Sequence, residues 1–170
     1  IIGGGFPLAA LGASADIMAH FDKAVVGADK WLMQLGTLSG NPVASAAGLK
    51  TMEILRRPGQ FKRLRELGQT LMDMQSAALT EQAIDHRICG DPTLFDIYFT
   101  DADPVDYRTA KHRDPKINQV WNTTLRANGV FKSPGKLYPS LALSSRDLEL
   151  TRSAFQHAAS AVSEHRMRAV

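Results

Sequence analysis

The sequence predicts that residues 59–170 form a small α+β domain. Apolar residues recur at helical spacing in several stretches of this half, which indicates amphipathic helices. Between the helical stretches, residues 95–99 alternate apolar and polar side chains, as a strand with one buried face does. Helices combined with a few short strands are typical of the α+β class. Pro58-Gly59 breaks the preceding helical pattern, so we predict a domain boundary there, between residues 1–58 and 59–170.

Residues 1–58 begin with a glycine-rich turn and lead to one long helix. The run Pro7–Ala13 is short and apolar, which predicts a buried strand, and Ala15–Phe21 has a short helical pattern. Asn41 is a favoured N-cap and Pro42 suits a first helical turn, so a helix is expected over residues 42–57. Its first residues are small, which would allow another backbone to approach closely.

The elements of residues 59–170 follow from the same rules. Helices are predicted from about 60 to 82, from Asp103-Pro104 until Asp114-Pro115, from 116 to 127, and after Ser144 or Ser145. Strands are predicted at 86–89 and 94–100, with further candidates at 130–131 and 140–143.

Composition argues against several classes of partner. The net charge is only +3, and the basic cluster between Lys50 and Arg65 is interrupted by Glu53 and contains a single aromatic residue, so no nucleic-acid partner is expected. Cys89 is the only cysteine and the histidines lack metal-ligand spacing, so no metal site is expected. No apolar run approaches the length of about 20 residues that a membrane span needs, and a cytoplasmic location is the default expectation.

The run from Gly36 to Pro42 is the most informative stretch for function. It is a loop of small residues that leads directly into the helix, and Thr37 and Ser39 offer hydroxyl groups just before the helix N-terminus. Unpaired N–H groups and the helix dipole favour an anion at such a position. Two interpretations are open: a phosphate or carboxylate contact, or a loop that only caps the helix.

Three motifs of the first half resemble the class III aminotransferases. They are Ile1-Ile2-Gly3-Gly4-Gly5 with the following Phe-Pro-Leu-Ala-Ala, Ala15-Asp16-Ile17-Met18, and the Gly36–Pro42 run. These proteins are fold-type I enzymes that use pyridoxal 5'-phosphate (PLP), and the most similar subgroup is that of glutamate-1-semialdehyde 2,1-aminomutase and its transaminase relatives. In this family the Ile-Ile-Gly-Gly-Gly run directly follows the lysine that forms a Schiff base with PLP. The resemblance therefore implies a catalytic lysine immediately before Ile1 and no catalytic residue within this chain.

The resemblance also implies the fold. Residues 1–58 correspond to the α/β end of the large PLP-binding domain and the start of a linking helix, and residues 59–170 to the small C-terminal α+β domain. In the family the threonine that matches Thr37 reaches across a homodimer to the PLP phosphate of the neighbouring subunit. Loop amides, here that of Gly36, assist it.

The substrate region of the family is expected around Lys136 and Tyr138. These two residues either line the pocket or belong to a surface turn. The aminomutase usually carries an acidic residue shortly after the proline that matches Pro134, whereas residues 135–139 contain no carboxylate. This difference favours a transaminase that acts on an ω- or β-amino acid or an amine.

The implied function is ping-pong transfer of an amino group between an amino acid or amine and a keto acid or aldehyde. The expected partners are a second subunit, the N-terminal remainder of the same protein, and small amino, keto or aldehyde substrates. The chain alone is expected to be inactive. Two alternatives stay open: the aminomutase itself, and a non-catalytic α+β dimerisation module.

Overall fold

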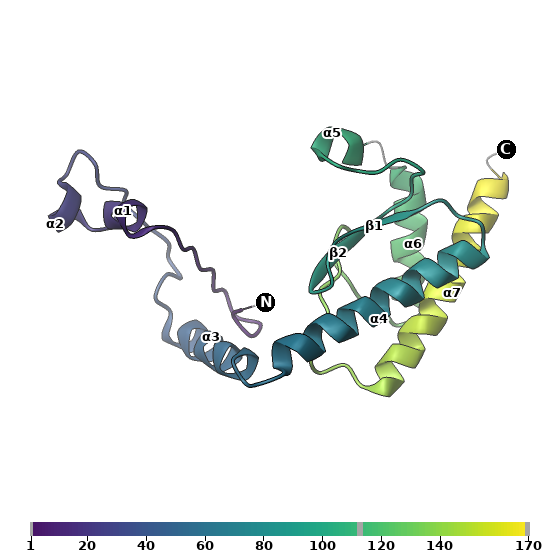
Figure 1. The fold of residues 1–170 in the computed structure, drawn as a ribbon, viewed down its shortest axis with the longest axis horizontal. Coiled ribbons are helices and arrows are strands. Elements are labelled where there is room, and N and C mark those ends of the chain that lie inside the picture. The colour runs from purple at the N-terminus through teal and green to yellow at the C-terminus, as the bar shows by residue number, and fades with distance from the viewer. Residues whose placement is uncertain (1, 112–113, 169–170) are drawn as a thin grey trace. The chain divides into compact units, whose positions relative to one another are not determined.

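The computed structural model describes residues 2–111 and 114–168. The chain divides into two compact units, Ile1–Pro58 and Gly59–Val170, whose elements are labelled in Figure 1. No helix within the described ranges is both long and apolar enough to cross a lipid bilayer.

The first unit contains three short helical segments and one longer helix. They are α1 (Ala15–Met18), η1 (Ala19–Phe21), α2 (Lys23–Val26) and α3 (Pro42–Leu55). The Oδ1 atom of Asn41 accepts hydrogen bonds from the N–H groups of Val43 and Ala44, each at 3.0 Å. The predicted N-cap and the helix that follows it are therefore confirmed.

The small residues of α3 form a close contact with the N-terminal segment. Ala44 and Gly48 are buried. A Cβ atom at Gly48 would lie 2.2 Å from a methyl group of Leu8 and 3.3 Å from the carbonyl oxygen of Ile2. The expected close approach of another backbone to this helix is thus confirmed.

The strand predicted at Pro7–Ala13 is wrong. These residues are exposed and adopt no regular secondary structure. No strand occurs among the described residues of the first unit, so the backbone N–H and C=O groups of this segment have no partner strand with which to form hydrogen bonds. An apolar run becomes a strand only where a neighbouring strand accepts its hydrogen bonds.

The second unit begins with the long helix α4 (Gln60–Glu81), followed by the antiparallel pair β1 (Arg87–Asp91) and β2 (Leu94–Tyr98). The register pairs Arg87 with Tyr98 and Asp91 with Leu94. The predicted face of this hairpin is confirmed, because Phe95, Ile97 and Phe99 are all buried.

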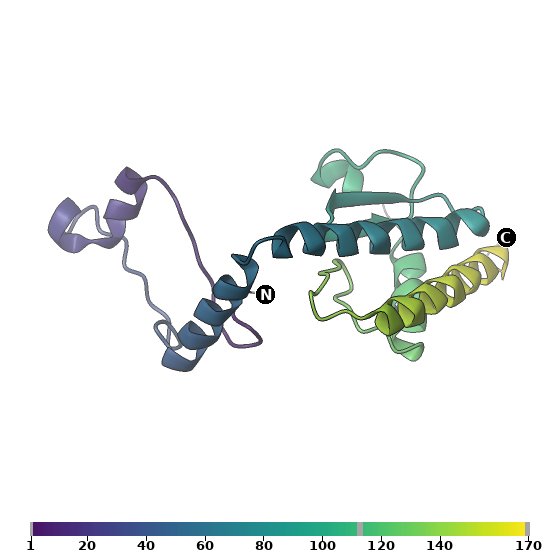
Figure 2. The same cartoon turned by 60° about the horizontal axis from the view of Figure 1, so that its bottom comes forward.

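Three further helices follow: α5 (Tyr107–Ala110), α6 (Pro115–Ala127) and α7 (Ser145–Arg168). Helix α7 packs against both α4 and α6, as Figure 2 shows. The predicted helix start at Asp103 is wrong. Asp106 is the N-cap of α5. Its carboxylate accepts a hydrogen bond from the Thr109 N–H, and the Thr109 hydroxyl group accepts one from the Asp106 N–H.

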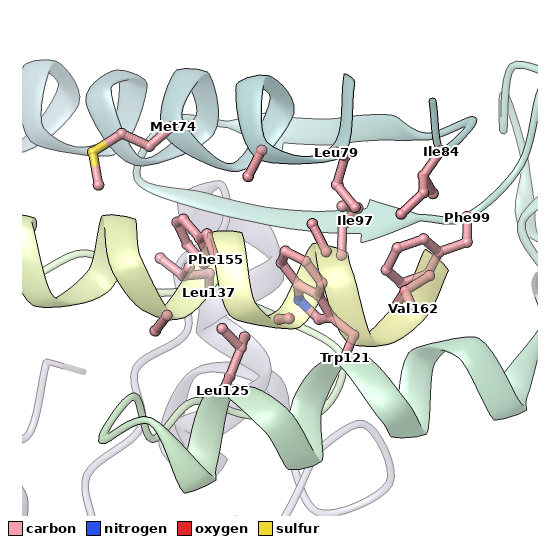
Figure 3. Packing of buried hydrophobic residues seen from close by; sticks show 14 of the residues in the cluster. Met74, Leu79, Ile84, Ile97, Phe99, Trp121, Leu125, Leu137, Phe155 and Val162 are labelled. Atoms are coloured by element: carbon pink, nitrogen blue, oxygen red, sulfur yellow. The ribbon is translucent and has the colours of Figure 1, made fainter. Parts of the chain in front are cut away.

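The core of the second unit lies between α4, α6, α7 and the hairpin. Trp121 is fully buried; its ring stacks on that of Phe155, with the ring centroids 5.7 Å apart, and forms a T-shaped contact with Phe99, with the centroids 5.8 Å apart (Figure 3). Apolar side chains from every surrounding element complete this cluster, including Leu79, Ile84, Ile97, Leu125, Leu137 and Val162.

The strand candidates at 130–131 and 140–143 are also wrong. Among the residues that the structure describes, the pairing between this region and the hairpin is an isolated β-bridge between Leu137 and Phe95. Pro139, two residues after Leu137, would hold the next hydrogen-bonded position and carries no N–H group, so the ladder cannot extend past it.

Candidate functional site

The Gly36–Gly40 segment forms a tight turn directly before α3. The Ser39 N–H donates to the Gly36 carbonyl oxygen at 3.0 Å, and the Asn41 N–H donates to the Leu38 carbonyl oxygen at 3.1 Å. Gly40 has a φ of 72°, a conformation that favours glycine. A Cβ atom at Gly36 would lie 2.6 Å from the Ser39 hydroxyl oxygen, so glycine keeps this turn compact.

The turn leaves several hydrogen-bond donors without a protein acceptor. Thr37 is exposed, and neither its hydroxyl group nor its N–H group donates a hydrogen bond within the described part of the chain. The N–H groups of Leu38 and Gly40 likewise donate no hydrogen bond to any acceptor within residues 2–111 and 114–168. These donors could bind an anion.

The N-terminus of α3 contributes fewer free N–H donors for an anion than the sequence suggested. Pro42 has no N–H group, the N–H groups of Val43 and Ala44 donate to Asn41 Oδ1, and that of Ser45 donates to the Asn41 carbonyl oxygen. All the first donors of the helix are therefore in use. Anion binding here depends on the turn, with the helix dipole as a background contribution.

The turn lines an open cavity of about 740 Å³ within the first unit. None of the described residues that line it carries an ionisable side chain, so no carboxylate would repel an anion. The lining residues are Pro7, Leu8, Ala9, Leu11, Gln34, Gly36, Thr37, Leu38, Ser39 and Gly40.

This donor set fits the phosphate group of PLP. A neutral hydroxyl group and backbone N–H groups can donate to a phosphate dianion without adding a titratable group. The cavity contains both Thr37 and Gly36, the two residues predicted to contact the phosphate. Gln34 was not predicted from the sequence; its Nε2 donates to the Ser39 hydroxyl oxygen at 3.2 Å and braces the turn. In the sequence, the only indication that Gln34 contacts the turn is its position two residues before Gly36.

A second cavity, of about 330 Å³, lies within the second unit and brings Lys136 and Tyr138 together. Its walls are mostly apolar, and Lys132 and Lys136 are its only ionisable residues besides the tyrosine phenol, among those described. The lining residues are Leu71, Val130, Phe131, Lys132, Ser133, Lys136, Leu137, Tyr138, Pro139, Ser140, Leu143 and Thr151. The cavity that contains Thr37 belongs to the first unit and shares no residue with this one.

Other chemistry-bearing residues do not form a site. Burial raises the pKa of the Cys89 thiol, which keeps it protonated and a poor nucleophile at neutral pH. Within the described ranges, no three His, Cys, Asp or Glu side chains cluster closely enough to hold a metal ion.

Comparison with known proteins identifies the family. Residues 1–159 match the family described as Aminotransferase class-III. The chain is 33% identical over 154 residues to glutamate-1-semialdehyde 2,1-aminomutase of Thermodesulfovibrio yellowstonii, covering 89% of this chain and 35% of the relative. It is 34% identical over 168 residues to the same enzyme of Propionibacterium freudenreichii, covering 96% and 36%. The chain thus spans about a third of the length of these curated relatives.

Solved structures agree with this assignment. An omega-transaminase from Sphaerobacter thermophilus superposes with a TM-score of 0.79 at 32% identity, covering 95% of this chain and 37% of that one. A β-phenylalanine aminotransferase from Variovorax paradoxus superposes with a TM-score of 0.73 at 27% identity, covering 91% and 35%. These matches confirm the expected fold-type I class and, with the family, PLP as its cofactor. The chain belongs to the class III aminotransferase family.

Proposed function

We propose that this chain is part of a PLP-dependent aminotransferase that moves an amino group between an amino acid or amine and a keto acid or aldehyde. The observation that carries the proposal is the family match over residues 1–159. The free donors of the Thr37 turn support it, because the cofactor of the family carries a phosphate group that needs such donors. PLP supplies an electron sink that stabilises negative charge on the substrate carbon after a proton leaves it.

Within this enzyme, Thr37 and Gly36 would hold the phosphate of PLP. The Thr37 hydroxyl group and the backbone of the turn donate to its oxygens. We propose that they do so across a homodimer, toward the cofactor of the neighbouring subunit. The exposure of Thr37 in the single chain is consistent with a contact made by a second subunit.

The proton-transferring lysine is proposed to precede Ile1, as the Ile-Ile-Gly-Gly-Gly run implies. Activity would then require the N-terminal remainder of the protein, and residues 1–170 alone would be inactive. A cytoplasmic location remains a prediction.

Lys136 and Tyr138 are proposed to contact the substrate. The 330 Å³ cavity combines apolar walls with lysine ammonium groups and has no carboxylate among its described lining residues. Such a cavity suits a substrate that carries both an apolar substituent and a carboxylate. β-Phenylalanine, the substrate named for the relative from Variovorax paradoxus, has this character.

The aminomutase is the second candidate function. The curated relatives at 33% and 34% identity carry that name. It predicts turnover of glutamate-1-semialdehyde without an added amino acceptor, whereas a transaminase needs one. The absence of an acidic residue at 135–139 favours the transaminase.

The cofactor site can be tested in the full-length protein by measuring PLP affinity in the variant Thr37→Val. A hydrogen bond to a charged group contributes about 1.5–3 kcal/mol, so affinity should fall about 10- to 100-fold while the fold is retained. Thr51→Val is the matched control, because the Thr51 hydroxyl group donates to the Ala47 carbonyl oxygen within α3. Equal PLP affinity in the wild type and the Thr37 variant would remove Thr37 from the site.

The reaction itself is tested by adding an amino donor to the full-length protein loaded with PLP. The visible absorption of the cofactor should bleach and return when a keto acid is added. Failure of every amino acid and amine donor to bleach it would refute the proposed function.

A further inference from the structure

The segment 132–138 has no helix and, in the described chain, one isolated β-bridge, yet hydrogen bonds on both sides of Lys136 hold it in place. On one side, the Pro134 carbonyl oxygen accepts hydrogen bonds from Asn122 Nδ2 at 3.1 Å and, at 3.5 Å each, from Asn118 Nδ2 and Lys132 Nζ. On the other side, the Leu137 N–H donates to the Phe95 carbonyl oxygen at 2.8 Å. Lys136 lies between these hydrogen bonds, so its backbone is constrained from both sides.

The two asparagines form a pair on one face of α6. They are four residues apart, which places their side chains next to each other on a helix. Asn122 Nδ2 also donates to the Asn118 carbonyl oxygen at 2.7 Å, which orients its amide group. Ile117 and Trp121, the residues that precede each asparagine, are buried in the core and anchor the helix beneath the pair.

The side chain of Asn122 includes a buried polar atom that the fold does not satisfy. Its Oδ1 atom is inaccessible to solvent and has no hydrogen-bond partner within the described ranges. An unsatisfied buried acceptor opposes folding, and an apolar side chain of similar size would avoid that penalty. The donor half of the amide is therefore the part that this position uses, and it bonds both the Asn118 carbonyl oxygen of α6 and the Pro134 carbonyl oxygen of the segment that lines the cavity.

We propose that Asn122, supported by Asn118, is a positioning residue for substrate selection. It holds the Pro134 carbonyl group and thereby keeps the Lys136 ammonium group and the Tyr138 ring at the 330 Å³ cavity, where Lys136 binds a substrate carboxylate. This inference rests on the proposed aminotransferase function and on the substrate role of Lys136. It adds that preference for a carboxylate-bearing donor is controlled from α6, by a residue that does not contact the substrate.

The test compares two amino donors in the full-length enzyme loaded with PLP: β-phenylalanine, which has a carboxylate, and 1-phenylethylamine, which has none. In Asn122→Leu, the ratio of KM for the amino acid to KM for the amine should rise about tenfold, since one charge-assisted contact is misplaced. The kcat for the amino acid should be close to that of the wild type. A merely structural role would change both donors alike.

Matched variants sharpen the result. Asn128→Leu makes the same substitution at the end of α6, at an asparagine that donates to the Thr124 carbonyl oxygen and contacts His157 instead of the 132–138 segment. It should leave the ratio unchanged. Asn122→Gln, which keeps an amide donor, should restore part of the preference. In a Lys136→Met background, Asn122→Leu should have no further effect on the ratio.

The outcomes separate the two proposals. An active wild type whose Asn122→Leu variant keeps the wild-type ratio overturns the positioning role and leaves the aminotransferase function standing. Equal changes of the ratio in Asn122→Leu and Asn128→Leu also overturn the positioning role. A wild type that transfers an amino group from neither donor nor from any other overturns both. Should Asn122→Leu not fold, Asn118→Ala replaces it, with a smaller rise in the ratio expected and an unchanged ratio counting against the role.

Discussion

The two units of this chain differ in how much apolar surface each one buries by itself. In the second unit, helices α4, α6 and α7 and the hairpin close around Trp121, Phe155 and Leu79, all with no exposed surface. In the described first unit, Ala44 is the only buried hydrophobic residue. Many of its large apolar side chains are exposed, including Leu11, Val25, Leu32, Met33, Leu35 and Leu49.

This difference separates a unit with its own core from one that depends on other surfaces. Exposed apolar patches of this kind mark interaction sites or aggregation hazards. The proposed homodimer and the N-terminal remainder of the protein are the surfaces that we expect to cover the first unit. The difference can be tested by separating the units and by substituting residues in each.

The largest effect is expected from expressing the two units separately. Residues 59–170 should unfold in one cooperative thermal transition followed by circular dichroism, because their core is complete. Residues 1–58 should show little helicity and no such transition, since an isolated short helix is marginal in water. A cooperative, monomeric fold of residues 1–58 would contradict the comparison.

The next effect tests the core of the second unit. Trp121→Ala removes a ring packed between Phe99 and Phe155, and the cavity should lower the free energy of unfolding by about 3–5 kcal/mol. Urea denaturation of residues 59–170 measures it. Trp31→Ala, in the first unit, is the matched control and should leave the stability of the second unit unchanged in the longer chain. A loss below about 1 kcal/mol for Trp121→Ala would show that the core is not closed.

A smaller effect compares two buried helical glycines. A Cβ atom at Gly68 would lie 1.8 Å from the carbonyl oxygen of Pro92, which is backbone of the hairpin turn. At Gly48 the nearest obstacle is a methyl group of Leu8, which can move. Gly68→Ala should therefore destabilise by about 1–3 kcal/mol despite the gain of about 1 kcal/mol in helix propensity. Gly48→Ala should cost less, as chemical denaturation of the full-length protein would show; the reverse order would contradict the structure.

The smallest expected effect is a pH dependence at the start of α7. The Ser144 N–H and hydroxyl groups donate to Asp147, and these bonds lower the pKa of its carboxyl group from the ordinary value of 3.8. A pKa lowered by folding stabilises the folded state above the unfolded pKa, and this stabilisation disappears as the pH falls through the folded value. The stability difference between wild type and Asp147→Asn should thus shrink below about pH 4.

Urea midpoints of residues 59–170 between pH 7 and pH 3 measure this dependence. Ser144→Ala removes the side-chain hydrogen bond and should weaken the same dependence. A difference between wild type and Asp147→Asn that stays constant with pH would show that these hydrogen bonds do not act on the carboxyl group.

Local signals in the sequence predicted the helices well, because each depends on residues that are close along the chain. Asn41 and Pro42 marked the start of α3, and the apolar spacing marked α4, α6 and α7. Strands were less predictable. The runs at 7–13, 130–131 and 140–143 had suitable composition, but a strand forms only where a partner is available. The bridge at Leu137 depended on β2 lying beside it, which no local pattern encodes.

The residues of the candidate site also fall into those that the sequence predicted and those that only the structure showed. Thr37 and Gly36 were predicted from the turn and the family motif, and the structure adds that Asn41 occupies the first donors of α3. The roles of Gln34 and Asn122 were not predictable, because each depends on a contact with a segment whose path the sequence does not specify.

The sequence by itself determined the family, the approximate boundaries of α3, α4, α6 and α7, and the turn that offers its donors to an anion, since these depend on neighbouring residues and on motifs. Only the tertiary structure decided which segments pair, which glycines lie against backbone, and which asparagine of α6 holds the 132–138 segment. Those features arise when distant parts of the chain bury shared surface, and a polar side chain such as Asn122 then donates to the backbone that the packing brings within reach.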